Sequence, residues 1–207
     1  MKDLVLLVAD KNIRATLEGL LGRPHALGIR PVTFDLFVHP RCDPGCFHEG
    51  AAFLASRRQG YGRGVLVFDR AWGVAPATDA EELRTKAEGR LAAAGLAGWA
   101  AAVVLDPELE AWVFSDSPHV GRALGWEGRS PDLWDWLRGQ GLLHPSTMKP
   151  ADPKGAVEAL LWEVRKPRSS ATYRDLAGTV SLARCTNPAF TRLRQIFQSW
   201  FPPEATP

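Results

Sequence analysis

Three aspartates stand at the ends of apolar segments in this 207-residue sequence: Asp10, Asp69 and Asp106. Carboxylates held close together repel one another unless a cation lies between them, and Mg²⁺ is a cation that carboxylate oxygens suit well. A Mg²⁺ ion bound by one or two carboxylates and by substrate phosphates is an arrangement used in phosphoryl transfer. These residues therefore indicate a metal-dependent site for phosphodiester chemistry, with Asp69 as a metal ligand.

Two glutamates extend this acidic set, Glu108 and Glu110, in a segment that we expect to form a short amphipathic helix over residues 107–114. Side chains two positions apart on a helix point to different faces, so only one of the two is expected to face the sheet. Leu109 and Trp112 are expected to be buried, which favours Glu110 as the inward residue. Either glutamate is a candidate for the second metal ligand.

Helix capping is the structural alternative for two of the aspartates. An Asp that follows a strand often accepts a backbone N–H of the next helix, and Asp10 and Asp106 both stand where such a cap is expected. Asp69 fits this alternative less well, because the residues that follow it, Arg70-Ala71-Trp72-Gly73, are not a typical helix start.

Two lysines are candidates for contacts with phosphate, Lys149 and Lys154. Lys154 is predicted to begin a helix, whose free N–H groups would also attract a phosphate. An ordinary exposed lysine is the alternative at this position. The sequence contains no Gly-rich loop of the Walker type.

A second candidate site lies in residues 39–48, which contain two cysteines and two histidines. Cys42 and Cys46 invite a zinc interpretation, but their spacing is not the usual structural pattern and no second ligand pair follows downstream. We therefore favour a loop between a strand and a helix, in which Asp43 caps the helix and Cys46 packs in the core.

Four apolar segments rich in Val, Leu and Phe are expected to be the strands that position these residues: 4–8, 31–38, 64–69 and 99–105. The segments between them have helical periodicity or helix caps, and the predicted helices cover 12–21, 46–58 and 79–94. Apolar strands that alternate with helices predict a Rossmann-like α/β fold with a parallel four-stranded sheet covered by helices on both faces. Ligands of such sheets bind beyond the carboxyl ends of the strands, where the acidic residues stand.

Further helices are predicted after the fourth strand, over residues 130–138, 154–165 and 189–200. We expect an α/β domain over residues 1–128 and a helical C-terminal extension over residues 129–207 that docks on it. A Pro-rich joint at residues 144–153 leads into the second of these helices.

The composition is that of an ordinary globular protein, with 45% hydrophobic and 23% charged residues and a formal net charge of +2. No segment approaches the ~20 consecutive apolar residues that a membrane span requires, and the first apolar run is expected to be a strand and not a signal peptide. Three scattered cysteines fit a reducing compartment, so we expect a cytoplasmic protein.

Four short motifs resemble a bacterial family with a Toprim-like domain, related to the Toprim domains of topoisomerases, primases and OLD-type nucleases. They are VLVFDRAWG at 65–73, ELEAW at 108–112, DPK at 152–154 and CTNPAF at 185–190. The resemblance implies a Toprim-like fold, a Mg²⁺ site and action on DNA or RNA. Because members of this group are often encoded beside restriction or antiviral genes, it also implies a role in defence against phage.

This sequence departs from the Toprim pattern at two positions. The glutamate that acts as general acid/base in Toprim proteins falls on Ala9, with Asp10 one residue later, and the second aspartate of the Asp-x-Asp pair falls on Ala71. The resemblance makes Asp10 the substitute acid/base if the strand has ended before it, since adjacent residues of a strand point to opposite faces. Loss of one ligand is expected to weaken Mg²⁺ binding.

Two functions follow as expectations. The first is a metal-dependent nuclease or phosphodiesterase in which Asp10, Asp69 and Glu110 are catalytic. The second is a catalytically inactive subunit that keeps the fold and binds protein partners in a multi-gene defence complex linked to restriction or methylation.

Overall fold

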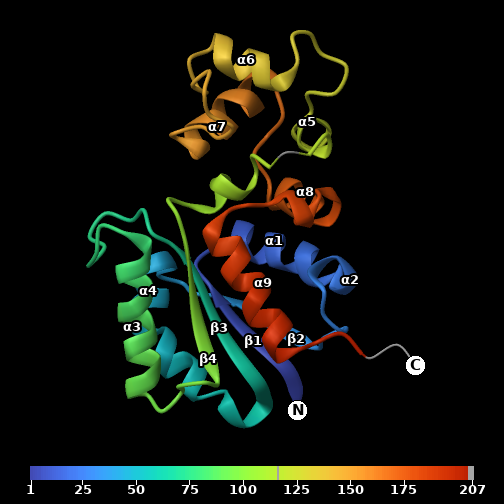
Figure 1. Ribbon diagram of the computed structural model, residues 1–207. Helices are drawn as coiled ribbons and strands as arrows, with labels where there is room; N and C mark the ends of the chain where they lie inside the picture. Colours follow the sequence, from blue (N-terminus) through green and yellow to red (C-terminus); the bar gives the residue numbers. More distant parts are fainter. Residues whose placement is uncertain (116, 205–207) are drawn as a thin grey trace.

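The computed structural model of the protein, which describes residues 1–115 and 117–204, is built on a four-stranded parallel sheet (Figure 1). The strands are β1 (Lys2–Val8), β2 (Phe34–Val38), β3 (Tyr61–Asp69) and β4 (Ala100–Leu105), in the order β2-β1-β3-β4. All three neighbouring pairs are parallel. The predicted α/β, Rossmann-like fold is therefore confirmed.

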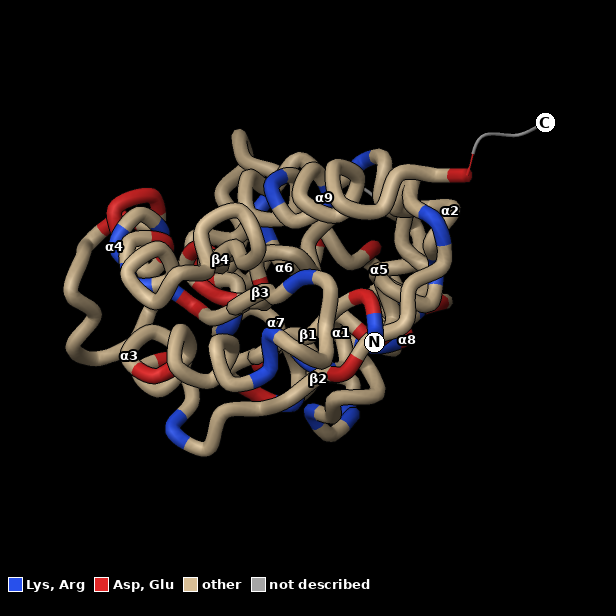
Figure 2. The backbone as a smooth tube through the Cα atoms, turned by 90° about the horizontal axis from the view of Figure 1, so that it is seen from below, with Lys and Arg blue, Asp and Glu red and all other residues tan. Residues whose placement is uncertain are grey.

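Helices cover both faces of the sheet because the chain reverses its direction along the sheet after β2. Right-handed crossovers then place the helix after β1 on one face and those after β2 and β3 on the other. The first is α1 (Lys11–Leu21), and the others are α3 (Cys42–Ala55) and α4 (Ala80–Ala93). Figure 2, seen from below, shows α3 and α4 on one side of the strands and α1 and α9 (Pro188–Trp200) on the other.

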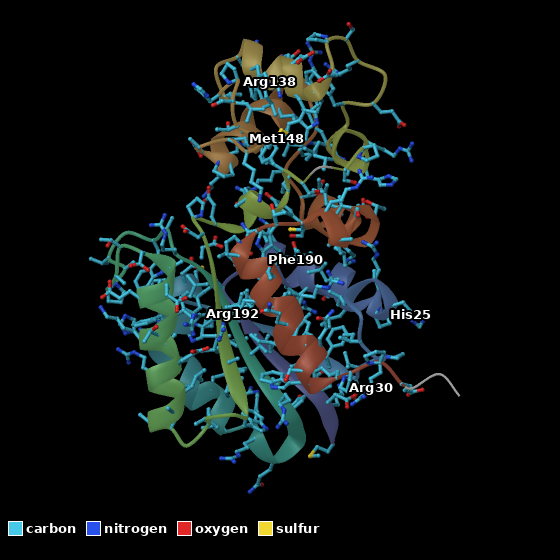
Figure 3. All side chains as sticks on the ribbon, in the orientation of Figure 1. His25, Arg30, Arg138, Met148, Phe190 and Arg192 are labelled. Carbon is cyan, nitrogen blue, oxygen red and sulfur yellow. The ribbon has the colours of Figure 1, made fainter. Side chains whose placement is uncertain are left out.

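The C-terminal helix α9 is part of the layer that covers the sheet. Its apolar side, which includes Leu193 and Phe197, is fully buried and lies against β4. Arg192, labelled on α9 in Figure 3, donates to the carbonyl of Ala102 in β4 and forms an ion pair with Glu88 of α4.

Helix α8 (Ser170–Thr179) packs along α1, and a glycine permits their close approach. A Cβ added to Gly19 of α1 would lie 2.6 Å from the carbonyl oxygen of Arg174 and 2.9 Å from the Cβ of Ala177. Only a residue without a side chain fits at this crossing.

A second group of helices lies beyond the carboxyl ends of the strands (Figure 1). It contains α5 (His119–Leu124), α6 (Leu133–Gly139) and α7 (Pro153–Glu163), and Met148 and Arg138 belong to it (Figure 3). Its interior contains Leu133, Leu137 and Leu160, and the rings of Trp126 and Trp136 pack together with their centroids 4.7 Å apart. The predicted extension over 129–207 thus contributes both to this group and, through α8 and α9, to the cover of the sheet. The boundary at residue 128 stays a prediction.

Several predicted elements differ from the structure. Helix α3 begins at Cys42, four residues before the predicted start, and the predicted helix over 107–114 is a short 3₁₀ helix, η2 (Leu109–Trp112). Strand β2 begins three residues after its predicted start and β3 three residues before it. Helices α2 (Pro24–Leu27), α5 and α8 were not expected. The remaining short elements are η1 (Arg58–Gly60) and η3 (Leu182–Arg184). Within the described part of the chain, no helix is both long and apolar enough to cross a membrane.

Candidate functional site

Asp69, the last residue of β3, lies at the centre of a group of five carboxylates at the carboxyl end of the sheet. Its Oδ1 atom is buried and has no hydrogen-bond partner. Burial raises the pKa of the Asp69 carboxyl well above its ordinary value, and the charges of Asp43, Glu110, Asp10 and Glu108 raise it further, in that order. A carboxylate in this position requires either a proton or a cation, because no donor neutralises it.

Asp43, in the first turn of α3, holds the end of β3 in place. Its Oδ1 accepts the backbone N–H of Asp69 at 2.8 Å. Burial raises the pKa of the Asp43 carboxyl, whereas the hydrogen bond from Asp69 opposes this shift. We expected Asp43 to cap a helix from a loop, which is wrong, because α3 has already begun at Cys42.

The turn that positions Asp43 depends on a second glycine. The buried imidazole of His39, the residue after β2, packs onto the backbone of Gly45. A Cβ at Gly45 would lie only 2.0 Å from Nδ1 of His39. The same Nδ1 accepts the N–H of Arg41 at 3.1 Å, so the histidine fixes the entry of the chain into α3.

Asp10 is the N-cap of α1, as the capping alternative predicted. Its Oδ1 accepts the N–H groups of Asn12 and Ile13, both at 2.8 Å. β1 ends at Val8, so Asp10 stands beyond the strand and not on its pleat. Its charge still contributes to the raised pKa of both Asp69 and Asp43. Asp10 therefore both caps α1 and belongs to the carboxylate cluster.

Glu108 and Glu110 both lie close enough to raise the pKa of Asp69, although they differ in their partners. The backbone of Glu108 is extended, with φ −160° and ψ 174°, so the helical spacing that we assumed does not apply to the pair. Glu108 lies 3.7 Å from Nζ of Lys154. Burial and Glu110 raise the pKa of the Glu108 carboxyl, and Lys154 opposes this.

Glu110 is only 2% exposed and its carboxylate is held by two side chains of the C-terminal region. Its Oε1 accepts the hydroxyl of Tyr173 at 2.6 Å and forms an ion pair with Arg168. Burial and the Glu110 charge raise the pKa of the Tyr173 phenol, which therefore stays a donor. The prediction that Glu110 faces inward is confirmed, and its predicted roles as catalytic residue and metal ligand stay predictions.

Of the other predicted residues, Asp106 and Lys149 lie outside this cluster and Lys154 lies at its edge. Asp106 does not cap a helix but forms an ion pair with Arg70 at 2.5 Å. Lys149 lines a separate hollow with Trp134 and Cys185, and none of the five carboxylates lines that hollow. The phosphate role of Lys149 is thus not supported by its position, whereas Lys154, in the first turn of α7, stands beside Glu108.

The two cysteines of the possible zinc site differ in burial. Cys42 is exposed, whereas Cys46 is fully buried in the core, as predicted, and burial raises the pKa of its thiol. Burial of a neutral thiol is the arrangement of a core residue, so zinc stays the less favoured interpretation.

The donor set can be compared with the needs of Mg²⁺. No three His, Cys, Asp or Glu residues of the described chain are arranged to hold a metal ion. Mg²⁺ commonly uses only one or two protein carboxylates and keeps several waters. Asp69, with an unpartnered Oδ1 and with the carboxylates of Asp43 and Glu108 nearby, meets that smaller requirement.

Asp43 is the member of the cluster that the sequence analysis did not include among the site residues. Its position in the sequence, shortly after the second strand in the segment Asp43-Pro44-Gly45, could have indicated that it lies at the carboxyl end of the sheet. In comparisons with known proteins, no family model, no curated protein and no solved structure matches this chain.

Proposed function

We propose that the five-carboxylate cluster is a Mg²⁺-dependent site for phosphodiester hydrolysis, in a Toprim-like protein that takes part in bacterial defence against phage. The observation that carries the proposal is the buried, unpartnered Oδ1 of Asp69 among four other carboxylates. A site that is only structural would be more stable without this charge. The resemblance of the four sequence motifs supports the Toprim relationship and the defence role.

Asp69 and Glu108 are the residues that would hold the metal ion. When bound, Mg²⁺ would supply Lewis-acid stabilisation of a phosphoryl group. Lys154, beside Glu108, would bind the substrate phosphate. Asp10 uses one oxygen for its cap, so its second oxygen can exchange a proton with water or with the leaving group.

An inactive subunit is the second candidate, and the state of Glu110 favours it. The ion pair with Arg168 and the hydrogen bond from Tyr173 occupy a carboxylate that a metal site would need. Ala9 and Ala71 remove two further acidic side chains of the Toprim pattern. In this alternative the protein, expected in the cytoplasm, binds protein partners of a defence complex without cutting nucleic acid.

The test is a cleavage assay with purified protein on single-stranded and double-stranded DNA and RNA, in Mg²⁺, in Mn²⁺ and in EDTA. We expect metal-dependent cutting that Asp69→Ala abolishes and that the control Asp132→Asn, at the exposed N-cap of α6, leaves unchanged. Cutting by Asp69→Ala at the wild-type rate would refute the assignment. Absence of cutting in every metal, with a partner protein raising the melting temperature, would favour the inactive subunit.

A further inference from the structure

Trp162, in the last turn of α7, exposes 86% of its surface. It borders an open hollow of about 690 Å³ whose other lining residues are Glu158, Leu161, Arg165, Lys166, Pro167 and Arg168. A flat indole in contact with water has a large apolar face without a partner, and such a face can stack on another planar group.

The charges around Trp162 favour an anionic partner. Arg165 and Arg168 line the hollow together with Lys166, against a single acid, Glu158. Arg165 is exposed, and no ion pair involving it is found among the described residues. Lys166 is already engaged, because its Nζ donates to the carbonyl of Ala123 at 2.6 Å. Arg168 is engaged as well, because it forms ion pairs with Glu158 and Glu110. The guanidinium group of Arg165 therefore remains as the recognition group, and such a group suits phosphate.

One face of α7 connects this hollow to the carboxylate cluster. Lys154, Glu158 and Trp162 follow one another at a spacing of four residues, which places them in a row along the helix. At 1.5 Å per residue, Lys154 and Trp162 stand about 12 Å apart along the axis. Lys154 is the residue that contacts Glu108.

Arg168 also connects the hollow to the carboxylate cluster. One of its nitrogens lies 3.2 Å from Glu158 in the hollow, and another forms the ion pair with Glu110 in the cluster. The hollow and the cluster are thus neighbouring parts of one surface, bordered by α7 and by the segment that leads into α8.

We propose that Trp162 is a stacking platform for an unpaired base, and that Arg165 holds the adjoining phosphate of a single-stranded nucleic acid. The base faces of a duplex are covered by their neighbours, whereas each base of a single strand offers a face to an aromatic ring. The inference rests on the proposed function, because it names single-stranded nucleic acid as the substrate of the carboxylate cluster. The stacked base at Trp162 would lie about 12 Å along α7 from Lys154 at the edge of the cluster.

The test measures binding without cleavage, in EDTA, by fluorescence anisotropy of a labelled 12-nucleotide poly-dT strand, the matching RNA and a duplex of equal length. We expect Trp162→Ala to weaken single-strand binding by about 5- to 100-fold, as for loss of one stacked base. Trp162→Phe, which keeps a ring, should retain most of the affinity. Arg165→Ala should lower the slope of log K against log salt by about one.

The matched control is Trp200→Ala, at the end of α9, where the ring packs against Arg63 of β3. Its affinity should equal that of the wild type. The proposal is overturned if the wild type binds no single strand, or if Trp162→Ala binds the single strand as tightly as the wild type does. It is also overturned if Trp162→Ala weakens duplex binding by the same factor as single-strand binding. Single-strand binding that depends on Trp162, in a protein that cuts nothing, would retain this inference and reject the proposed function.

Discussion

Replacement of Asp69 by asparagine should stabilise the protein in the absence of divalent metal. The substitution keeps the shape of the side chain and removes the charge of a carboxylate whose Oδ1 has no partner. A buried charge without a partner costs more than a buried neutral polar group, and asparagine keeps the polar atom but removes the charge. We therefore expect Asp69→Asn to increase the free energy of unfolding by about 1–3 kcal/mol at pH 7 in EDTA.

The pH dependence follows from the direction of the Asp69 shift. Because the pKa of Asp69 is raised in the native state above its ordinary value of 3.8, the native state binds more protons than the unfolded chain above that pH. The wild type therefore loses stability as the pH rises from about 4 toward the native pKa. The asparagine variant lacks this loss, so the two proteins should become equally stable near pH 4.

Urea and thermal unfolding across pH 4 to 8 would measure this difference. For a chain of this length, 1 kcal/mol corresponds to about 2–4 °C in Tm, so the predicted gain is about 2 to 12 °C at pH 7. The control Asp132→Asn should not gain stability, because backbone hydrogen bonds lower the pKa of the exposed Asp132 cap.

Addition of Mg²⁺ should reduce or reverse the advantage of the variant. A ligand at ten times its Kd stabilises the native state by about 1.4 kcal/mol, and the wild type alone keeps the carboxylate that we assign as ligand. The reasoning is refuted if Asp69→Asn is less stable than the wild type in EDTA at pH 7, or if the difference does not change with pH.

Three further substitutions, with Gly89→Ala as a control, test the packing in and beside the site by urea denaturation. Tyr173→Phe removes the hydroxyl that donates to the buried Glu110 and should cost about 1.5–3 kcal/mol, and an unchanged midpoint would contradict the importance of this bond. Ser115→Ala removes a buried hydroxyl without a partner, so the variant should be equally stable or more stable by about 1 kcal/mol. Gly19→Ala should cost about 1–3 kcal/mol because its methyl group would meet the backbone of α8, whereas Gly89→Ala, with open space around it in α4, should be neutral or stabilising by up to about 1 kcal/mol.

The sheet could be predicted from the sequence because its strands are covered on both faces. Such strands are continuous apolar runs, and the run that ends in Asp69 is the clearest example. Asp79 was also predictable as the cap of α4, since a cap acts on the residues next to it in the chain. Local signals were sufficient for these elements.

The partners of the site residues could not be predicted in this way. Glu110 is held by Arg168 and Tyr173, which lie 58 and 63 positions away in the chain. Helix α8, which supplies Tyr173, has a buried side of mostly small or polar residues and therefore no strong periodic signal. The contact of Asp43 with the backbone of Asp69 likewise depends on how α3 sits against β3.

The position of α9 has a consequence for biosynthesis. The face of β4 that this helix covers belongs to a strand completed at Leu105, whereas α9 spans Pro188–Trp200. On the ribosome, where synthesis proceeds at about 5–20 residues per second, that apolar face stays exposed for roughly 5–20 seconds until the helix emerges. A nascent chain in this interval is a substrate for chaperones and prone to aggregation, so truncations that remove α9 should yield insoluble protein.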